Sequence, residues 1–257
     1  MDLDPDLAAL RSLGGFFVLR TLPPPPPPPA AAGGGGGPHR LPTLAEAYGG
    51  VAPHGRHDAL ALRVATVGAR LRTAELRVAA SLAQQGLAAR LWSAALGCAV
   101  LYGRLPSLDP GLLRWDPLAS APDDLWLTGV RALPGDAGTV AAVVLDAHLE
   151  PLGAALRARY GVAAGLLRGN AGSALAATAR ELARRARAHG RTDAAERARA
   201  LTGELFTHPL LRATGARAGT AFRRRSCCLY YRVPGGGLCG DCCLTRLPRS
   251  SPRAASG

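Results

Sequence analysis

The sequence predicts an α+β fold: a mostly helical domain with a small antiparallel sheet and a cysteine-rich loop near the C-terminus. Apolar residues recur at helical spacing over several stretches, and the longest runs from residue 75 to residue 102. Two shorter stretches, residues 16–21 and 125–130, are rich in β-prone residues and supply the sheet. Five of the six cysteines fall between residues 227 and 243, too tight a cluster for packing alone.

The composition allows a substantial core and argues against two classes of protein. Of the 257 residues, 48% are hydrophobic, which is enough for one large domain or two small ones. The positive charge behind the net +13 is carried by arginine alone, scattered along predicted helices, and only 5% of residues are aromatic. We therefore expect no nucleic-acid partner. No run of eighteen apolar residues occurs, so we expect no membrane span.

The first forty residues contain two predicted elements and an insertion. Leucines at helical spacing predict a helix over residues 3–13, which Gly14 and Gly15 end. Residues 16–21 are predicted to form the first strand. A run of prolines followed by alanines and glycines predicts a disordered insertion over residues 22–40. A proline tract also suits an aromatic groove on a partner, and this alternative stays open.

The central part of the chain supplies most of the core. Besides the strand at 125–130 and a turn at 133–138, the pattern predicts helices over residues 56–73, 75–102 and 139–159. The apolar face of the helix at 75–102 is broad, so we expect it at the centre of the core. Cys98 lies in this helix among small apolar residues and is predicted to be an inert buried thiol.

The C-terminal part is rich in arginine. Two helices are predicted over residues 171–189 and 192–207, and residues 212–225 are interpreted as a basic connector. We expect three units: a main domain over residues 1–222, a cysteine-rich segment over 223–247, and a disordered tail over 248–257.

The cysteine-rich segment holds Cys227, Cys228, Cys239, Cys242 and Cys243. Neighbouring side chains of an extended strand point to opposite faces, so the first two share a site only where the backbone bends. A proline and three glycines at residues 234–237 supply a sharp return between the two halves.

Three kinds of site use clustered cysteines. Disulfides need an oxidising compartment, but the acidic N-terminus does not look like a secretory signal, so we expect a cytoplasmic protein. A structural zinc takes four thiolates, usually in two well-spaced pairs, whereas the first pair here has no spacer. An iron–sulfur cluster also takes four thiolates, and two metals offer ligand positions over a wider volume. The spacing favours the cluster and leaves zinc open.

The pattern Cys-Cys-x10-Cys-x2-Cys closely resembles the C-terminal signature of FhuF-type ferric-siderophore reductases, a family related to the C-terminal part of siderophore synthetases. The resemblance implies a 2Fe–2S cluster whose ligands are Cys227, Cys228, Cys239 and Cys242. By spacing, Cys243 is an alternative to Cys242. Residues 223–247 would then be the cluster-binding segment.

The resemblance also implies an activity. Reductases of this kind transfer one electron to the ferric iron of hydroxamate-type siderophores and release ferrous iron in the cytoplasm, because the oxygen donors hold ferrous iron far more weakly. Two other classes stay open: an iron–sulfur electron carrier without a siderophore site, and a zinc-stabilised interaction protein.

Further stretches resemble the family and suggest a substrate pocket. Residues 77–83 and 89–96 resemble its central helix, and the family places polar residues of a later helix near the ligand. The resemblance implies contacts to the siderophore from Trp92, His148, Arg168 and Asn170. Trp92 and His148 also suit packed core positions, and Asn170 also suits the cap of the helix predicted from residue 171.

Four arginines flank the cysteines, namely Arg223, Arg224, Arg225 and Arg232. A cluster with four thiolates is negative and becomes more negative on reduction, so nearby cations favour the reduced form and raise its potential. Arginines that face solvent would have only a small effect, because their charge is screened.

The sequence lacks a nucleotide site of its own. No Gly-x-Gly-x-x-Gly fingerprint follows a predicted strand, and no Walker motif occurs. We therefore expect the electrons to come from another protein, such as a ferredoxin or a flavoprotein. The basic surface suits an acidic donor.

Overall fold

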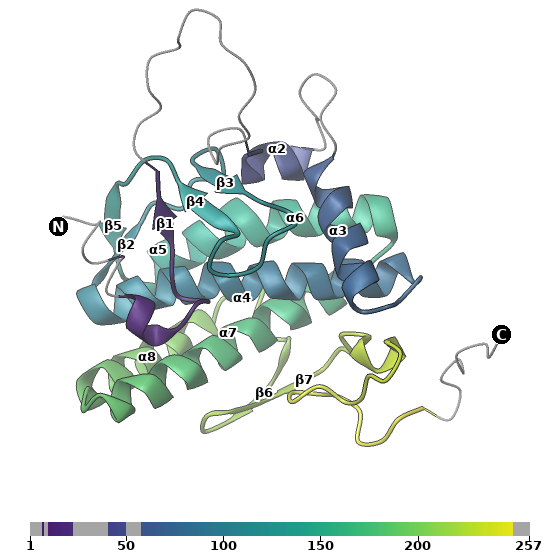
Figure 1. The fold of residues 1–257 in the computed structure, drawn as a ribbon. Helices are drawn as coiled ribbons and strands as arrows, with labels where there is room; N and C mark the ends of the chain where they lie inside the picture. Colours follow the sequence, from purple (N-terminus) through teal and green to yellow (C-terminus); the bar gives the residue numbers. More distant parts are fainter. Residues whose placement is uncertain (1–6, 8–9, 23–40, 50–57, 249–257) are drawn as a thin grey trace, which may run out of the picture.

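The structure is a computed structural model and describes residue 7 and residues 10–22, 41–49 and 58–248. Long helices form its centre and three small sheets lie beside them, which confirms the predicted α+β class (Figure 1). Most of the predicted insertion and tail, at residues 23–40 and 249–257, lies outside the described residues. So does most of the N-terminal part of the helix predicted at residues 3–13.

Helix α4 (Leu76–Tyr102) runs through the middle of the molecule. It packs against α7 (Ala164–Ala188) and α3 (Ala59–Arg70), and α7 packs in turn against α8 (Thr192–Leu205). Residues on most sides of α4 are buried, which agrees with its broad apolar face. The helix ends where Gly103 adopts a φ of 66°, a conformation that favours glycine. The helix predicted at 75–102 is confirmed, and so is its central position.

A second long helical run confirms the helix predicted at 139–159. It consists of α5 (Ala137–Ala141), the π-helical segment η3 (Ala142–Leu149) and α6 (Glu150–Tyr160). By length and composition alone, this run could cross a membrane. Half of its most apolar window is buried inside the fold, however, and core helices of soluble proteins pass the same test.

The sheets are small. The largest joins, in this order, β1 (Arg20–Thr21), β4 (Leu125–Leu127) and β3 (Leu113–Trp115). The two others pair β2 (Arg104–Pro106) with β5 (Ala132–Pro134), and β6 (Gly215–Ala218) with β7 (Ala221–Arg224). The expected partnership of the stretches at 16–21 and 125–130 is confirmed, although β1 runs parallel to β4 and the other strand pairs are antiparallel. β1 is short because residues 15–17 form a turn.

Several elements differ from the predictions. Helix α7 begins at Ala164 rather than residue 171, so Asn170 lies inside the helix and does not cap it. Glycines in its first turns lower the apparent helix propensity of this stretch. Most of the predicted connector at 212–225 is the hairpin β6–β7, which turns at Gly219 with a φ of 60°. The described end of the helix predicted at 3–13 is the 3-10 turn η1 (Leu10–Leu13). Two elements too short for periodicity to reveal are α2 (Leu44–Gly49) and η4 (Tyr230–Arg232).

A buried arginine joins α4 to the N-terminal segment. The side chain of Arg90 is 2% exposed, and its Nε pairs with the Asp124 carboxylate at 2.8 Å. Its two terminal nitrogens donate to the carbonyls of Phe16 and Val18. Every nitrogen of this guanidinium therefore has a partner, and its charge is compensated, which a buried cation requires.

His148 of η3 is fully buried and held in the neutral state. Its Nε2 donates to the carbonyl of Leu108, and its Nδ1 accepts from the Tyr48 hydroxyl at 2.8 Å. Burial lowers the pKa of His148 from 6.5 to about 4, although the contact with the Leu108 carbonyl acts in the opposite direction. The ring therefore stays uncharged in the folded protein at neutral pH.

This shift predicts a pH dependence of stability. The unfolded ring protonates near pH 6.5 and the folded ring only near pH 4. Between these values the unfolded state binds more protons, so the free energy of unfolding decreases as the pH is lowered. From pH 7 to pH 4 we expect the wild type to lose about 3 kcal/mol more free energy of unfolding than the His148→Gln variant. Urea unfolding at a series of pH values measures this difference, and parallel curves for the two proteins would contradict it.

Candidate metal centre

The cysteine-rich segment follows the hairpin β6–β7 and lies along the face of α7 that is turned away from α6 (Figure 1). After β7 it contains little regular structure besides the single turn η4. Leu229, just before this turn, adopts a φ of 71°, so the chain bends sharply directly after the first cysteine pair. The irregular backbone that two adjacent cysteines need to share a site is therefore present.

Hydrogen bonds fix this segment to both central helices. On α4, the Ser81 hydroxyl donates to the carbonyl of Cys228 at 2.8 Å. Glu75, immediately before α4, pairs with Arg232 at 2.9 Å. On α7, the carbonyl of Gly165 accepts from the hydroxyl of Ser226 at 3.0 Å. The scaffold therefore holds the segment on either side of the first cysteine pair.

Glycines of α7 allow the segment to approach closely. A Cβ on Gly169 would collide with the Ser226 hydroxyl, and a Cβ on Gly172 would lie 2.5 Å from the Thr214 hydroxyl. At Gly165, one turn earlier, a Cβ would meet nothing within 4 Å. A methyl at either of the first two glycines would therefore force its neighbours to shift, whereas a methyl at Gly165 would not.

The five cysteines share one neighbourhood. Burial raises the pKa of the Cys227 thiol, and the charges of Cys243 and Cys242 raise it further. Burial likewise raises the pKa of Cys239 to about 12, with further contributions from the charge and hydrogen bond of Cys228 and from the charge of Cys242. Since these thiols resist ionising side by side, a cation that binds them as thiolates must displace their protons.

Backbone N–H groups point at three of the sulfurs. Cys227 Sγ accepts from the N–H of Leu229 at 3.3 Å, and Cys242 Sγ accepts from that of Leu244 at 3.4 Å. The N–H of Asp241 lowers the pKa of Cys239. Such donors stabilise the ionised form of a sulfur. At both Cys227 and Cys242, the donor is the N–H two residues after the cysteine. Because Cys242 shares this contact with a predicted ligand, we favour Cys242 over Cys243 as the fourth ligand.

The clustered cysteines and Arg224 suit a negatively charged group bound by thiolates: the cysteines supply sulfur ligands, and Arg224 supplies a positive charge. Among the described residues, no three His, Cys, Asp or Glu side chains already stand close enough to hold a metal ion, so assembly requires side-chain rotation or tightening of the loop. The carboxylate of Asp241, between two of the cysteines, is engaged by Ser173 and Arg180. Buried Arg224 has two nitrogens without a partner in the protein, and these donors suit a bound anion.

The four flanking arginines occupy different environments. Arg223 and Arg225 are exposed, and Arg223 contacts the carbonyl of Cys243. Arg232 is neutralised by the Glu75 carboxylate. Only Arg224 is buried, with a side chain that is 2% exposed, and its charge lowers the pKa of Cys227. This difference could not be predicted from the sequence, because Arg223, Arg224 and Arg225 are consecutive and look alike there.

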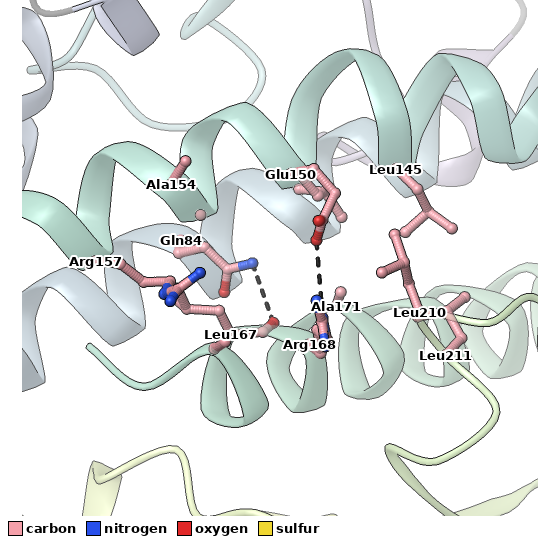
Figure 2. A pocket seen from close by; sticks show the side chains of 13 residues that line it. Gln84, Leu145, Glu150, Ala154, Arg157, Leu167, Arg168, Ala171, Leu210 and Leu211 are labelled. Atoms are coloured by element: carbon pink, nitrogen blue, oxygen red, sulfur yellow. Dashed lines mark hydrogen bonds and ion pairs between the residues drawn. The ribbon is translucent and has the colours of Figure 1, made fainter. Parts of the chain in front are cut away.

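The predicted substrate residues are not brought together. Trp92, His148 and Asn170 are buried, and each bonds to neighbouring groups of the core: Trp92 Nε1 donates to the carbonyl of Ala171, for example. Arg168 is partly exposed and lines a small cavity, open to solvent, between α4, α6 and α7 (Figure 2). Their contacts with substrate stay a prediction.

Three polar residues of this cavity were missed from the sequence, and one of them, Glu150, pairs with Arg168 at 3.9 Å (Figure 2). Gln84 is 2% exposed, and its Oε1 has no partner, while its Nε2 donates to the carbonyl of Leu167 (Figure 2). Arg157 lies on the cavity wall beside it. A glutamine inside the apolar pattern of the central helix was the available signal. The cavity therefore offers an amide oxygen, two guanidinium groups and one carboxylate between apolar walls.

Comparison with known proteins supports the assignment of this segment. Residues 224–244, which include all five clustered cysteines, match the family model described as the FhuF 2Fe-2S C-terminal domain. No curated protein matches the chain. The match confirms the resemblance and supports a 2Fe–2S cluster as the cofactor.

Single cysteine variants test the ligand set. We expect Cys227→Ser, Cys228→Ser, Cys239→Ser and Cys242→Ser each to lose the cluster, since each removes one of four thiolates. Cys243→Ser should retain full iron and sulfide content and the visible spectrum. Loss of the cluster in Cys243→Ser together with its retention in Cys242→Ser would reverse the assignment.

A glycine pair tests the close packing on α7. Gly169→Ala should lower the free energy of unfolding by about 1–3 kcal/mol, because the new methyl overlaps the Ser226 hydroxyl. Gly165→Ala should be neutral or stabilising by up to about 1 kcal/mol, because its Cβ meets open space and alanine favours helix. Adding Ser226→Ala should rescue the first variant. Equal effects of the two glycine substitutions in urea unfolding would refute this packing.

Proposed function

We propose that the protein is a cytoplasmic ferric-siderophore reductase. The observation that carries the proposal is the gathering of five thiols in one loop on α7, within the stretch that matches a 2Fe–2S domain. A bound cluster would accept and donate one electron at a time. The substrate is the ferric complex of a hydroxamate siderophore, whose iron leaves as the ferrous ion after gaining that electron.

The chain's own residues would hold the cofactor and set its surroundings. Cys227, Cys228, Cys239 and Cys242 would be its ligands. The N–H groups of Leu229 and Leu244 would donate to sulfur and reduce the negative charge there. Of these four cysteines, Cys228 is buried and the other three are partly exposed.

The cavity beside Arg168 is a reasonable place for one arm of the siderophore. Arg168 and Arg157 suit oxygen-rich or anionic groups, and the unpartnered Gln84 Oε1 suits a donor such as a hydroxyl or amide N–H. Gly169, next to Arg168 in the chain, touches Ser226 of the cysteine-rich segment. Cavity and cysteines would then be separated by the thickness of one helix, about 10–12 Å.

An arginine-rich groove suits docking of the electron donor. This groove lies between α7, α8 and the hairpin β6–β7, with Phe206 and Phe222 among its apolar residues. Four arginines line it: Arg180, Arg187, Arg199 and Arg217. Arg180 also pairs with Asp241, between two of the cysteines, so the groove adjoins the proposed centre. An acidic ferredoxin or flavoprotein would be attracted to this surface.

Reoxidation of the reduced protein tests the substrate. Under anaerobic conditions, a ferric hydroxamate siderophore should return the dithionite-reduced protein to its oxidised visible spectrum and release ferrous iron to a chelating dye. The gallium complex of the same siderophore is the control, because gallium does not accept an electron under these conditions. A reduced spectrum that persists with the ferric complex would leave an electron carrier without a siderophore site, and a colourless protein containing zinc would favour the interaction protein.

Charge reversal tests the donor surface. Arg199→Glu should slow reduction by an acidic ferredoxin about tenfold or more at low salt, and the difference should shrink as salt screens the charges. Arg131→Glu is the matched control, since this arginine is exposed next to β5, away from the groove. Similar rates for the two variants, measured by stopped-flow absorption, would argue against docking in the groove.

A further inference from the structure

Arg224 is a buried cation whose charge the protein does not compensate. It is the last residue of β7, and its side chain is 2% exposed. Its Nη2 donates to Asn170 Oδ1 at 2.5 Å and to the carbonyl of Leu166 at 3.5 Å. Its Nε and Nη1 are buried and have no partner. Both acceptors are neutral, and no carboxylate of the described residues pairs with this guanidinium.

The same fold treats its other buried arginine differently. Arg90 is equally buried, yet all its nitrogens have partners and the Asp124 carboxylate balances its charge. Near Arg224 the available carboxylate is that of Asp241, whose oxygens are taken by Ser173 and Arg180. An unpaired buried charge destabilises a protein strongly. The contrast indicates that the counter-charge of Arg224 comes from outside the polypeptide.

Hydrogen bonds position Arg224 rather than neutralise it. Asn170 accepts from the guanidinium through Oδ1 and donates through Nδ2 to Ser81, to its carbonyl at 2.9 Å and its hydroxyl at 3.1 Å. The Ser81 hydroxyl in turn donates to the carbonyl of Cys228. The network therefore links the guanidinium to the cysteine pair, and the charge of Arg224 already acts on Cys227.

We propose that Arg224 is the buried counter-charge of the thiolate-bound centre and that Asn170 and Ser81 are its positioning residues. This inference rests on the proposed cofactor but not on the proposed substrate. A fixed cation favours the reduced centre, because reduction adds negative charge. Solvent screens the charges of exposed Arg223 and Arg225, and Glu75 neutralises Arg232. Of the four flanking arginines, Arg224 should therefore have the largest effect on the midpoint potential of the centre.

Redox titration of the loaded protein against a reference dye tests the proposal. Arg224→Gln should shift the one-electron equilibrium toward the oxidised form about tenfold or more, equivalent to about 59 mV. Arg224→Lys should restore most of the potential, because it keeps the charge. Arg223→Gln, the matched exposed control one residue away, should shift the equilibrium less than about twofold.

A second variant adds a negative charge beside Arg224 and leaves Arg224 itself in place. Asn170→Asp is nearly isosteric and puts a carboxylate against the guanidinium, so it should move the potential in the same direction as Arg224→Gln. This variant still tests the proposal if the Arg224→Gln protein does not assemble the cluster. An unchanged potential in Asn170→Asp, or equal shifts in Arg224→Gln and Arg223→Gln, would overturn the proposal.

The metal-free protein provides a readout that does not depend on loading. Without the cluster, Arg224→Leu should be as stable in urea as the wild type or more stable, because it removes an uncompensated charge. Arg90→Leu should be clearly destabilised, because it strands the Asp124 carboxylate. If both variants lose similar stability, Arg224 is a structural residue and the inference fails. None of these measurements uses a siderophore, so failure of the substrate proposal leaves them unaffected.

Discussion

The close packing of the cysteine-rich segment on α7 is the constraint on which the rest of the site depends. Gly169 leaves room for Ser226, and Asn170 of the same turn binds Arg224 of the incoming strand. These contacts fix where β7 ends and therefore where Cys227 begins. Larger side chains on this face of the helix would push the segment away, and the thiols would lose both their shielding and their common neighbourhood.

The site is organised by charge as well as by packing. Partial burial raises the pKa values of Cys227 and Cys239 and disfavours the ionised state that a metal requires, while N–H groups and one buried guanidinium favour it. A negative group bound by these thiols would satisfy Arg224, and Arg224 would in turn stabilise that group. The segment and its cofactor are therefore expected to depend on each other for stability.

The sequence was sufficient for the long helices and for the cysteine-rich loop, because helical periodicity and cysteine spacing are local signals. It was insufficient where tertiary contacts override local propensity: α7 starts seven residues earlier than predicted, and Gly169 in this stretch lowers helix propensity but leaves room for Ser226. The burial of Arg224 could not be predicted for a similar reason. Buried and exposed side chains alternate along the four-residue strand β7, but three consecutive arginines show no such alternation in the sequence. The sequence could not show that His148 and Trp92 are both buried, because burial depends on contacts between distant parts of the folded chain.

The most direct test of the central claim is the electron paramagnetic resonance spectrum of freshly purified protein, recorded before and after reduction with dithionite. If four thiolates of this loop hold two irons, the oxidised protein should be silent, and the reduced protein should give a signal of about one spin per chain. A protein that is colourless and silent in both states, with zinc as its only metal, would contradict the claim.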